Sequence, residues 1–219
     1  MEEPSWIINY RDIISEFRLV LYKFEFFDLN FQGFINEINK SLIHCGYDPV
    51  NVIVSDTMTE LFGAYSVYVP SKPVSRIYVS TELLKKPRTL LGRVLMHEVF
   101  HHVLFQKPPS PLFKLAPRRT EPLILITIPL LFLAIAAAIF RPYYALPYIV
   151  VSSAIMVFSV AALLIKALSD HELAATALVI YLITGRWIKD WVYYHSDDAL
   201  MSLKWYDNVK PREIVMRER

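Results

Sequence analysis

The chain has little of what marks a secreted or a nucleic-acid-binding protein. Its single cysteine, Cys45, allows no disulfide within the chain and indicates a reducing compartment. Residues 5–27 alternate charged with apolar side chains after an acidic start, so we expect no cleavable secretory signal. The net charge of +2 is close to neutral and argues against nucleic acid as a partner. No internal repeat or low-complexity stretch occurs, which argues against a repeat architecture.

The strongest positive signal is the run HEVFHH at 97–102, in which His97, Glu98 and His101 form an HExxH pattern. Residues i and i+4 of a helix lie one turn apart on the same face, so both imidazoles can bind one metal ion. Glu98 is then close enough to take a proton from water at that metal. A helix is expected over Arg88–Phe105, between flanking prolines, so the motif lies well inside it. The alternative is an amphipathic helix that happens to carry two histidines.

A third ligand is needed, because catalytic zinc sites use three protein ligands and leave one position open. Glu172 is the expected third ligand and His171 the next candidate, in the helical stretch DHELAATA that starts at Asp170. Glu172 would complete the His2Glu set of a zinc hydrolase, with one Zn2+ per chain. From the residues alone, Glu172 fits equally well as an acidic residue that favours the N-terminal dipole of its helix.

Two uncharged runs, Pro122–Phe140 and Pro142–Ile165, are separated by Arg141 alone. Each has about the 20 residues that a helix needs to cross the hydrocarbon core, so we expect two transmembrane helices joined by a tight turn. The alternative is a buried helical hairpin. Lysine and arginine residues lie before the first run and after the second. The positive-inside rule therefore predicts a multi-pass cell-membrane protein whose catalytic part and both termini are cytoplasmic.

The expected fold class is α+β, mainly α, with a zinc-protease unit that contains a small β-sheet and is interrupted by the transmembrane hairpin. The expected parts are an N-terminal helical segment (1–48), a catalytic part with strands and the motif helix (49–120), the hairpin (121–168) and a second catalytic part with the third-ligand helix (169–219). Helices are expected at 7–26, 28–44 with Asp28 as N-cap, from Thr81, and at 170–184, 187–194 and 197–206; strands are expected at 50–54, 64–69 and 76–80.

The order of these motifs resembles the integral-membrane gluzincin metalloproteases, which include the HtpX-like heat-shock proteases and the CAAX prenyl endopeptidases. In that family an HExxH helix is followed by two transmembrane helices and then by an ExxAD helix whose glutamate is the third zinc ligand. Here HEVFH at 97–101, the uncharged runs and Glu172-Leu-Ala-Ala-Thr follow in the same order. The resemblance covers roughly residues 50–205. It implies a zinc-dependent endopeptidase that acts on membrane or membrane-proximal proteins, with the lipid bilayer as a further partner.

The chain departs from the family pattern at two positions. Thr176 stands where the family has an aspartate that supports the active-site histidines, so support is expected from another residue such as Asp170. The family's later histidine, which steadies the transition state, is matched by His195, although the family's proline is missing after it. The resemblance implies a catalytic role for His195, and the alternative is a surface helix cap. Transmembrane helices that precede the catalytic unit in the family are also missing here.

For peptide-bond hydrolysis we expect Glu98 to act as the general base. The strand at Ala64–Val69 is expected to pair with an extended substrate, and Tyr65 or Tyr68 to donate to the developing oxyanion. His102 is expected to support or pack against the site without binding metal. A catalytically silent metal-binding membrane adaptor or scaffold is the alternative function, whereas the chain's six histidines are too few for a membrane di-iron hydroxylase.

Overall fold

The computed structural model describes residues 6–108, 171–186 and 197–206, together with the isolated positions 135, 139, 154 and 157. The chain divides into two compact units. One comprises Met1–Ser110 with Ala174–Arg219, and the other comprises Pro111–Leu173. Of the second unit the structure describes the four isolated positions and residues 171–173, all of which are helical. The elements below belong to the first unit unless stated otherwise.

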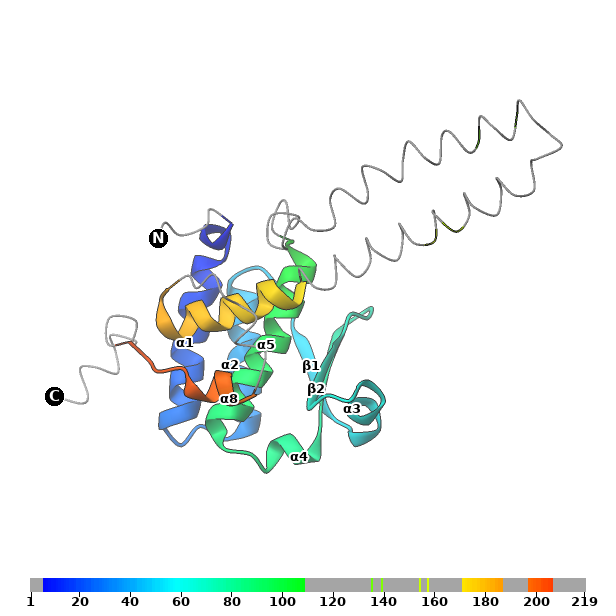
Figure 1. Ribbon diagram of the computed structural model, residues 1–219. Coiled ribbons are helices and arrows are strands. Elements are labelled where there is room, and N and C mark those ends of the chain that lie inside the picture. The colour runs from blue at the N-terminus through cyan, green and yellow to red at the C-terminus, as the bar shows by residue number, and fades with distance from the viewer. Residues whose placement is uncertain are drawn as a thin grey trace. The chain divides into compact units, whose positions relative to one another are not determined.

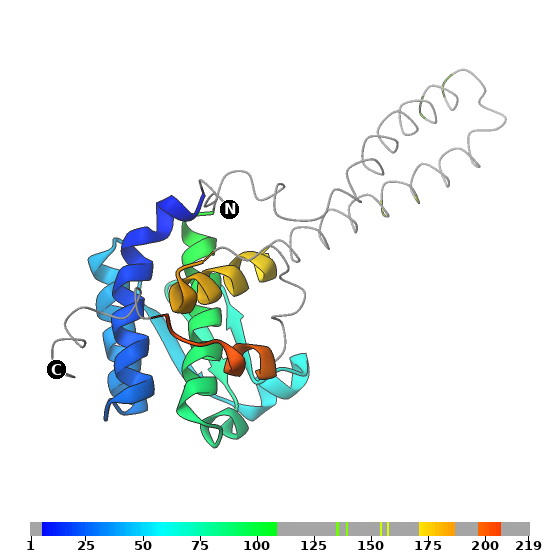
Figure 2. The same ribbon diagram turned by 60° about the vertical axis from the view of Figure 1, so that its left-hand side comes forward.

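Two long helices pack against each other at the N-terminal side of the first unit (Figures 1 and 2). The short 3-10 helix η1 (Ile7–Tyr10) runs into α1 (Arg11–Phe26), as predicted, and α2 (Phe31–His44) follows after a short loop. Apolar side chains at helical spacing are buried between them. The N-cap of α2 is Asn30, whose side chain accepts a 2.7 Å hydrogen bond from the Gly33 N–H. The prediction of Asp28 as the cap is therefore wrong.

A three-stranded sheet follows the two helices. Its strands are β1 (Val50–Val54), β2 (Ser66–Val69) and β3 (Ser75–Val79), all within two residues of the predicted bounds. The spatial order is β1-β3-β2, with β1 parallel and β2 antiparallel to β3. Helix α3 (Asp56–Phe62) connects β1 to β2 and was not predicted. Ile77 at the centre of β3 is fully buried, so the sheet is anchored on its middle strand.

Helix α5 (Arg88–Gln106) is the central element of the first unit, and the short helix α4 (Thr81–Leu84) leads into it. Helix α1, the strands β2 and β3 and the C-terminal helix α8 (Asp197–Ser202) all pack against α5 (Figures 1 and 2). Gly92 permits the close approach of α1, because a Cβ at this position would lie 2.8 Å from Cδ1 of Leu21. The helix that carries the HExxH motif is thus held from several sides.

A further helix covers residues 171–184, in agreement with the predicted third-ligand helix. Its positions 174–180 are all buried. The helix ends at Gly185, whose φ of +63° is the left-handed conformation that terminates many helices. Near this end Arg18 of α1 donates from Nε to the Leu182 carbonyl oxygen at 2.9 Å. Arg18 thereby satisfies a terminal carbonyl and ties the helix to α1.

The predicted transmembrane hairpin is not supported by the described part of the chain. Within residues 6–108, 171–186 and 197–206, no helix has both the length and the apolar character needed to cross a bilayer. The longest of these helices, α5, carries Arg93 and the charged and polar residues of the HExxH motif. The predicted spans at 122–140 and 142–165 lie outside the described residues, apart from the four isolated positions.

The predicted fold class and location are corrected accordingly. The described fold is a mixed α/β unit, mostly helical, with a small three-stranded sheet. The prediction of a transmembrane hairpin in the fold and that of a multi-pass membrane location with cytoplasmic termini are contradicted by the described helices. Of the remaining predicted elements, the helix at 187–194 lies outside the described residues. Helix α8 ends at Ser202, four residues before the predicted end at 206.

A buried ion pair connects α5 to α1 and to the C-terminal segment. Arg93 donates from Nε to Oε1 of Glu25 at 2.8 Å, and the two side chains are 3 % and 1 % exposed. Arg93 also donates to the carbonyl oxygens of Leu200 and Leu203, while Trp205 Nε1 donates to Oε2 of Glu25 at 2.8 Å. Because Arg93 lies one turn before the first histidine of the motif, this network fixes α5 next to the candidate site.

Replacing Arg93 with methionine is expected to lower the free energy of unfolding by about 3–5 kcal/mol, because the Glu25 carboxylate would stay buried without its charge partner. Urea denaturation followed by circular dichroism measures this change. The double variant Glu25→Gln/Arg93→Met removes both charges and keeps an acceptor for Trp205, so it should recover part of the loss. A loss of under about 1 kcal/mol for Arg93→Met, as in an exposed pair, would contradict the prediction.

Candidate metal centre

The HExxH motif lies in the middle of α5, and its two histidines project from the same face of the helix. The Nε2 atoms of His97 and His101 are 3.0 Å apart, and the rings stand at 84° with their centroids separated by 4.6 Å. His101 is 8 % exposed, whereas His97 is half-buried. Two imidazole nitrogens directed at one point from successive turns of a helix are the arrangement that a shared metal ion requires.

Glu172, on the helix over 171–184, provides the third potential ligand. The ligand atoms of His97, His101 and Glu172 all lie within 4.8 Å of one another. Ligands at 2.0–2.2 Å from a tetrahedral zinc ion are separated by about 3.4 Å. Because the Glu172 side chain is exposed, its rotation can close the remaining gap, and the donor set fits zinc. Among the described residues, these three side chains form the one group of this kind, and they are the predicted ligands.

Thr176 lies one turn after Glu172, and its hydroxyl faces His97. Its Oγ1 is 3.5 Å from Nδ1 of His97, and the residue is 1 % exposed. A hydroxyl oxygen can accept the Nδ1–H of a neutral imidazole, which leaves Nε2 with its lone pair for a metal. Thr176 itself therefore faces His97 and can support it. Asp170 lies outside the described residues, so support from that residue stays a prediction.

The predicted base, Glu98, is held by a strand residue that the sequence did not reveal. Glu98 is 8 % exposed and accepts a hydrogen bond from Ser66 Oγ at 2.8 Å. Ser66 is the first residue of β2, 32 positions away, and a serine at the start of a strand carries no signal that identifies this contact. A carboxylate has about four acceptor sites. One hydrogen bond from Ser66 therefore orients Glu98 and leaves it able to accept a proton.

His102 is directed away from the metal ligands, in agreement with the prediction that it supports the site. Its Nε2 lies 2.8 Å from the Asp48 carbonyl oxygen, and its Nδ1 lies 3.3 Å from the Tyr68 hydroxyl. Burial lowers the pKa of the His102 imidazole and outweighs the hydrogen bond to Asp48, which acts in the opposite direction. The neutral ring is thus favoured, and it connects α5 to β2 and to the loop before β1.

Tyr65, Tyr68 and His195 are the predicted donors to the oxyanion, and the contacts of the two tyrosines are described. The Tyr68 hydroxyl is engaged with His102 and donates to Ser75 Oγ at 3.2 Å, which makes it a poor candidate. The ring of Tyr65 lies under the Lys86 ammonium group, 5.2 Å from the ring centroid to Nζ. The predicted catalytic residue His195 lies outside the described residues, so its role stays a prediction.

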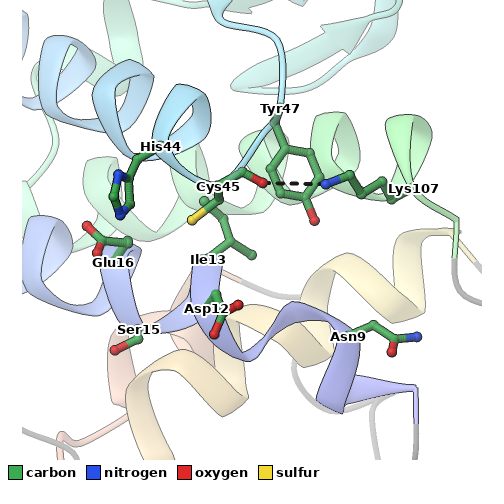
Figure 3. A pocket seen from close by; sticks show the side chains of 9 residues that line it. All are labelled: Asn9, Asp12, Ile13, Ser15, Glu16, His44, Cys45, Tyr47 and Lys107. Carbon is green, nitrogen blue, oxygen red and sulfur yellow. Dashed lines mark hydrogen bonds between the residues drawn. The ribbon is translucent and has the colours of Figure 1, made fainter.

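A separate cavity of about 510 Å³ lies between α1 and the end of α2 (Figure 3). Its charged rim includes Asp12 and Glu16 on α1 and Lys107, whose Nζ donates to the Cys45 carbonyl oxygen at 3.4 Å. Burial raises the pKa of the Cys45 thiol, and Glu16 and Asp12 add to this effect. The thiol is therefore protonated and unreactive at neutral pH. The cavity shares no lining residue with the metal-ligand cluster. The residues that line the cavity are Asn9, Asp12, Ile13, Ser15, Glu16, His44, Cys45, Tyr47 and Lys107.

The described residues therefore bring two imidazoles and one exposed carboxylate together, and a buried carboxylate, Glu98, follows the first of these histidines on α5. Two histidines and one glutamate are the kind of donor set that a catalytic zinc ion uses. His171, the alternative third ligand, is half-buried beside Glu172 and does not belong to the cluster. Comparison of the chain with protein-family models, with curated proteins and with solved structures finds no match.

Proposed function

We propose that the protein is a zinc-dependent endopeptidase in which His97, His101 and Glu172 hold the metal and Glu98 is the general base. The observation that carries the proposal is the clustering of the ligand atoms of these three side chains within 4.8 Å of one another. Glu98 follows His97 directly on α5, and Ser66 orients its carboxylate. Zinc is the metal of choice because a His2Glu set with one open position is typical of catalytic zinc in peptidases.

The chemistry divides between the metal and the chain's own residues. When bound, a zinc ion would supply Lewis-acid polarisation of a carbonyl group and a lowered pKa for water. Glu98 takes the proton of the attacking water and passes it to the amine that leaves when the peptide bond breaks. Ser66 keeps the Glu98 carboxylate in one orientation through its 2.8 Å hydrogen bond, so the base needs no reorientation during the reaction.

The free edge of the sheet, which packs on α5, favours a peptide as the substrate. Strand β2 is an edge strand in the order β1-β3-β2 of the described sheet. The Ser80 N–H donates to the Tyr65 carbonyl oxygen at 2.9 Å, and alternate residues of an antiparallel strand bond to its partner. The backbone groups of Ser66 and Tyr68 therefore point to the outer edge, while their side chains contact Glu98 and His102 of α5. An extended peptide added to this edge would run past the base.

We infer a gluzincin-like arrangement from the same residues. The HExxH helix, an intervening segment and a later helix with the third ligand occur in the gluzincin order. The departure at Thr176 is compatible with this inference, because its hydroxyl faces His97 from the position of the family's aspartate. The substrates of such a peptidase are proteins or peptides.

Metal analysis of the purified full-length chain, combined with a casein cleavage assay, tests the proposal. We expect about one zinc ion per chain. A chelator should abolish cleavage, and added zinc should restore it. A protein without bound metal after zinc is supplied, or cleavage that is indifferent to the chelator, would remove the zinc peptidase from consideration.

A further inference from the structure

The cavity between α1 and the end of α2 has no part in the proposed reaction, and it has the size of a binding site. Its volume of about 510 Å³ lies within the range of about 300–1,000 Å³ that is usual for pockets that bind small molecules. Helix α1 forms one wall, and the end of α2 with the loop after it forms the opposite wall (Figure 3). Most of the lining side chains are polar or charged, so the cavity suits a small polar molecule.

Two carboxylates on α1 give this cavity its charge. Asp12 and Glu16 are four residues apart, so they project from the same face of the helix, and both line the cavity. Among the residues that the structure describes, neither carboxylate has a hydrogen bond or an ion pair. Asp12 lies in the first turn, where the helix dipole favours a negative charge, whereas Glu16 lies beyond that turn. Two like charges at this spacing repel each other, and a cation placed between them would remove the repulsion.

Tyr47 adds a buried polar group to the same cavity. The residue is 6 % exposed, and its hydroxyl is directed toward α1, into the cavity (Figure 3). Within the described part of the chain this hydroxyl has no hydrogen-bond partner. Burial raises the pKa of Tyr47 to about 12, and Cys45 and Asp12 add to the effect, so the hydroxyl is neutral at physiological pH. A buried polar group without a partner is unfavourable, and a ligand that bonds to it would satisfy it.

Lys107 lines the cavity but does not neutralise the two carboxylates. Its Nζ donates to the Cys45 carbonyl oxygen at 3.4 Å and lies 4.1 Å from the centroid of the Tyr47 ring. Two carboxylates and one ammonium group, counted alone, leave a formal charge of −1 on the lining (−2 + 1). A metal ion is a poor occupant, because among the described residues neither carboxylate belongs to a group of three possible metal ligands.

We propose that this cavity binds a small organic cation through a primary ammonium group, which donates to the carboxylates of Asp12 and Glu16 and to the hydroxyl oxygen of Tyr47. An ammonium group has three N–H donors and no acceptor, which matches these three acceptors. Hydrogen bonds between charged groups are among the strong ones in proteins. The carbon chain of the ligand would pack against Ile13, which is 1 % exposed and lines the cavity. This inference is independent of the proposed function, since the cavity and the metal-ligand cluster share no residue.

Calorimetric titration of the full-length protein with 1,4-diaminobutane tests the inference, at about 0.15 M salt so that attraction to exposed charges is screened. We expect saturable binding of about one molecule per chain. The neutral 1,4-butanediol has the same carbon chain and should not bind. The double variant Asp12→Asn/Glu16→Gln should weaken diamine binding by at least about 10-fold, because it removes both charges. Tyr47→Phe keeps the ring and removes the hydroxyl, which should weaken binding by about 3- to 10-fold.

Glu37→Gln is the matched control, because Glu37 is a carboxylate on α2 that pairs with Lys40 at 2.5 Å and does not line the cavity. Its diamine affinity should equal that of the natural chain. Absence of diamine binding, equal binding of the diol, or unchanged affinity in the double variant would overturn the inference. Displacement of the diamine by calcium would overturn it as well, since the cavity would then be a metal site. Zinc content and peptide cleavage are not measured here, so any of these results leaves the proposed function untouched.

Thermal melting of each variant checks that it folds. Asp12 is exposed and Glu16 is half-buried, so the double variant should keep the fold of the natural chain. If Tyr47→Phe does not fold, the double variant and the diol decide between the two outcomes.

Discussion

Replacing Glu98 with glutamine is expected to leave zinc bound and to reduce peptide cleavage by about 10²- to 10⁴-fold, the usual contribution of a general base. The amide has nearly the shape of the carboxylate and can still accept the Ser66 hydrogen bond, so the site should keep its geometry. It cannot take a proton from water at neutral pH. The loss should therefore appear in kcat, with little change in KM. Steady-state kinetics on a fluorogenic peptide that the natural chain cleaves would measure both constants.

A control for this experiment is Glu82→Gln, which removes a carboxylate that is exposed on α4 and pairs with Lys86 at 3.7 Å. Cleavage by this variant should equal that of the natural chain. Zinc content, measured on the same preparations, should be the same in all three proteins. Full activity in Glu98→Gln would mean that another group activates water. Loss of zinc in that variant would instead point to a structural role for the carboxylate beside the ligands.

The site residues that the sequence predicts correctly are mainly those that lie close together in the chain. His97, Glu98 and His101 lie within five positions of one helix, so helical geometry alone places the imidazoles together, and the structure has them 3.0 Å apart. The strands were found in the same way, from short apolar runs between turn-forming residues. Glu172 was expected as the third ligand from its place in the helical stretch after the second uncharged run, and the order of motifs in a resembling family favoured it further. Its ligand atom lies within 4.8 Å of the histidine nitrogens.

The residues that sequence reasoning missed act through contacts that no short pattern encodes. Ser66 is 32 positions from Glu98, Thr176 is 79 from His97, and Trp205 is 180 from Glu25. Such pairs depend on how β2, the third-ligand helix and the C-terminal segment pack against α5 and α1. The threonine at position 176 suggested that support for the histidines was lost, because the resembling family has an aspartate there. The position on the helix face is nevertheless the same, and the hydroxyl faces His97.

Helix α3 is missing from the predicted elements for a different reason, although the signals at its two ends are local. Ser55 caps its first turn by accepting a hydrogen bond from the Met58 N–H at 3.4 Å, and Gly63 ends it with a φ of +62°. Both are recognised helix boundaries. The segment between them is only seven residues long and has one buried side chain, Thr59, so it lacks the apolar stripe by which the longer helices were identified.

Replacing Glu172 with alanine is expected to lower zinc affinity by more than about 100-fold, because even the loss of a partner behind a ligand costs 10- to 100-fold. Two histidines would remain, and they are too few to hold catalytic zinc against solvent. Zinc would then no longer raise the melting temperature of the protein, since stabilisation by a ligand follows its concentration relative to the dissociation constant. Chelator competition and thermal melting with and without zinc measure the two effects.

His171→Ala is the decisive companion to this variant, because His171 precedes Glu172 on the same helix and was the alternative ligand. If the cluster of His97, His101 and Glu172 holds the metal, His171→Ala keeps its zinc and Glu172→Ala loses it. The reverse result would transfer the third ligand to His171. Equal retention of zinc in both variants would mean that the helix over 171–184 supplies no ligand, and the His2Glu centre would have to be abandoned. Because both substitutions lie in the same helical turn, any general effect of shortening a side chain there is shared by the pair and cancels from the comparison.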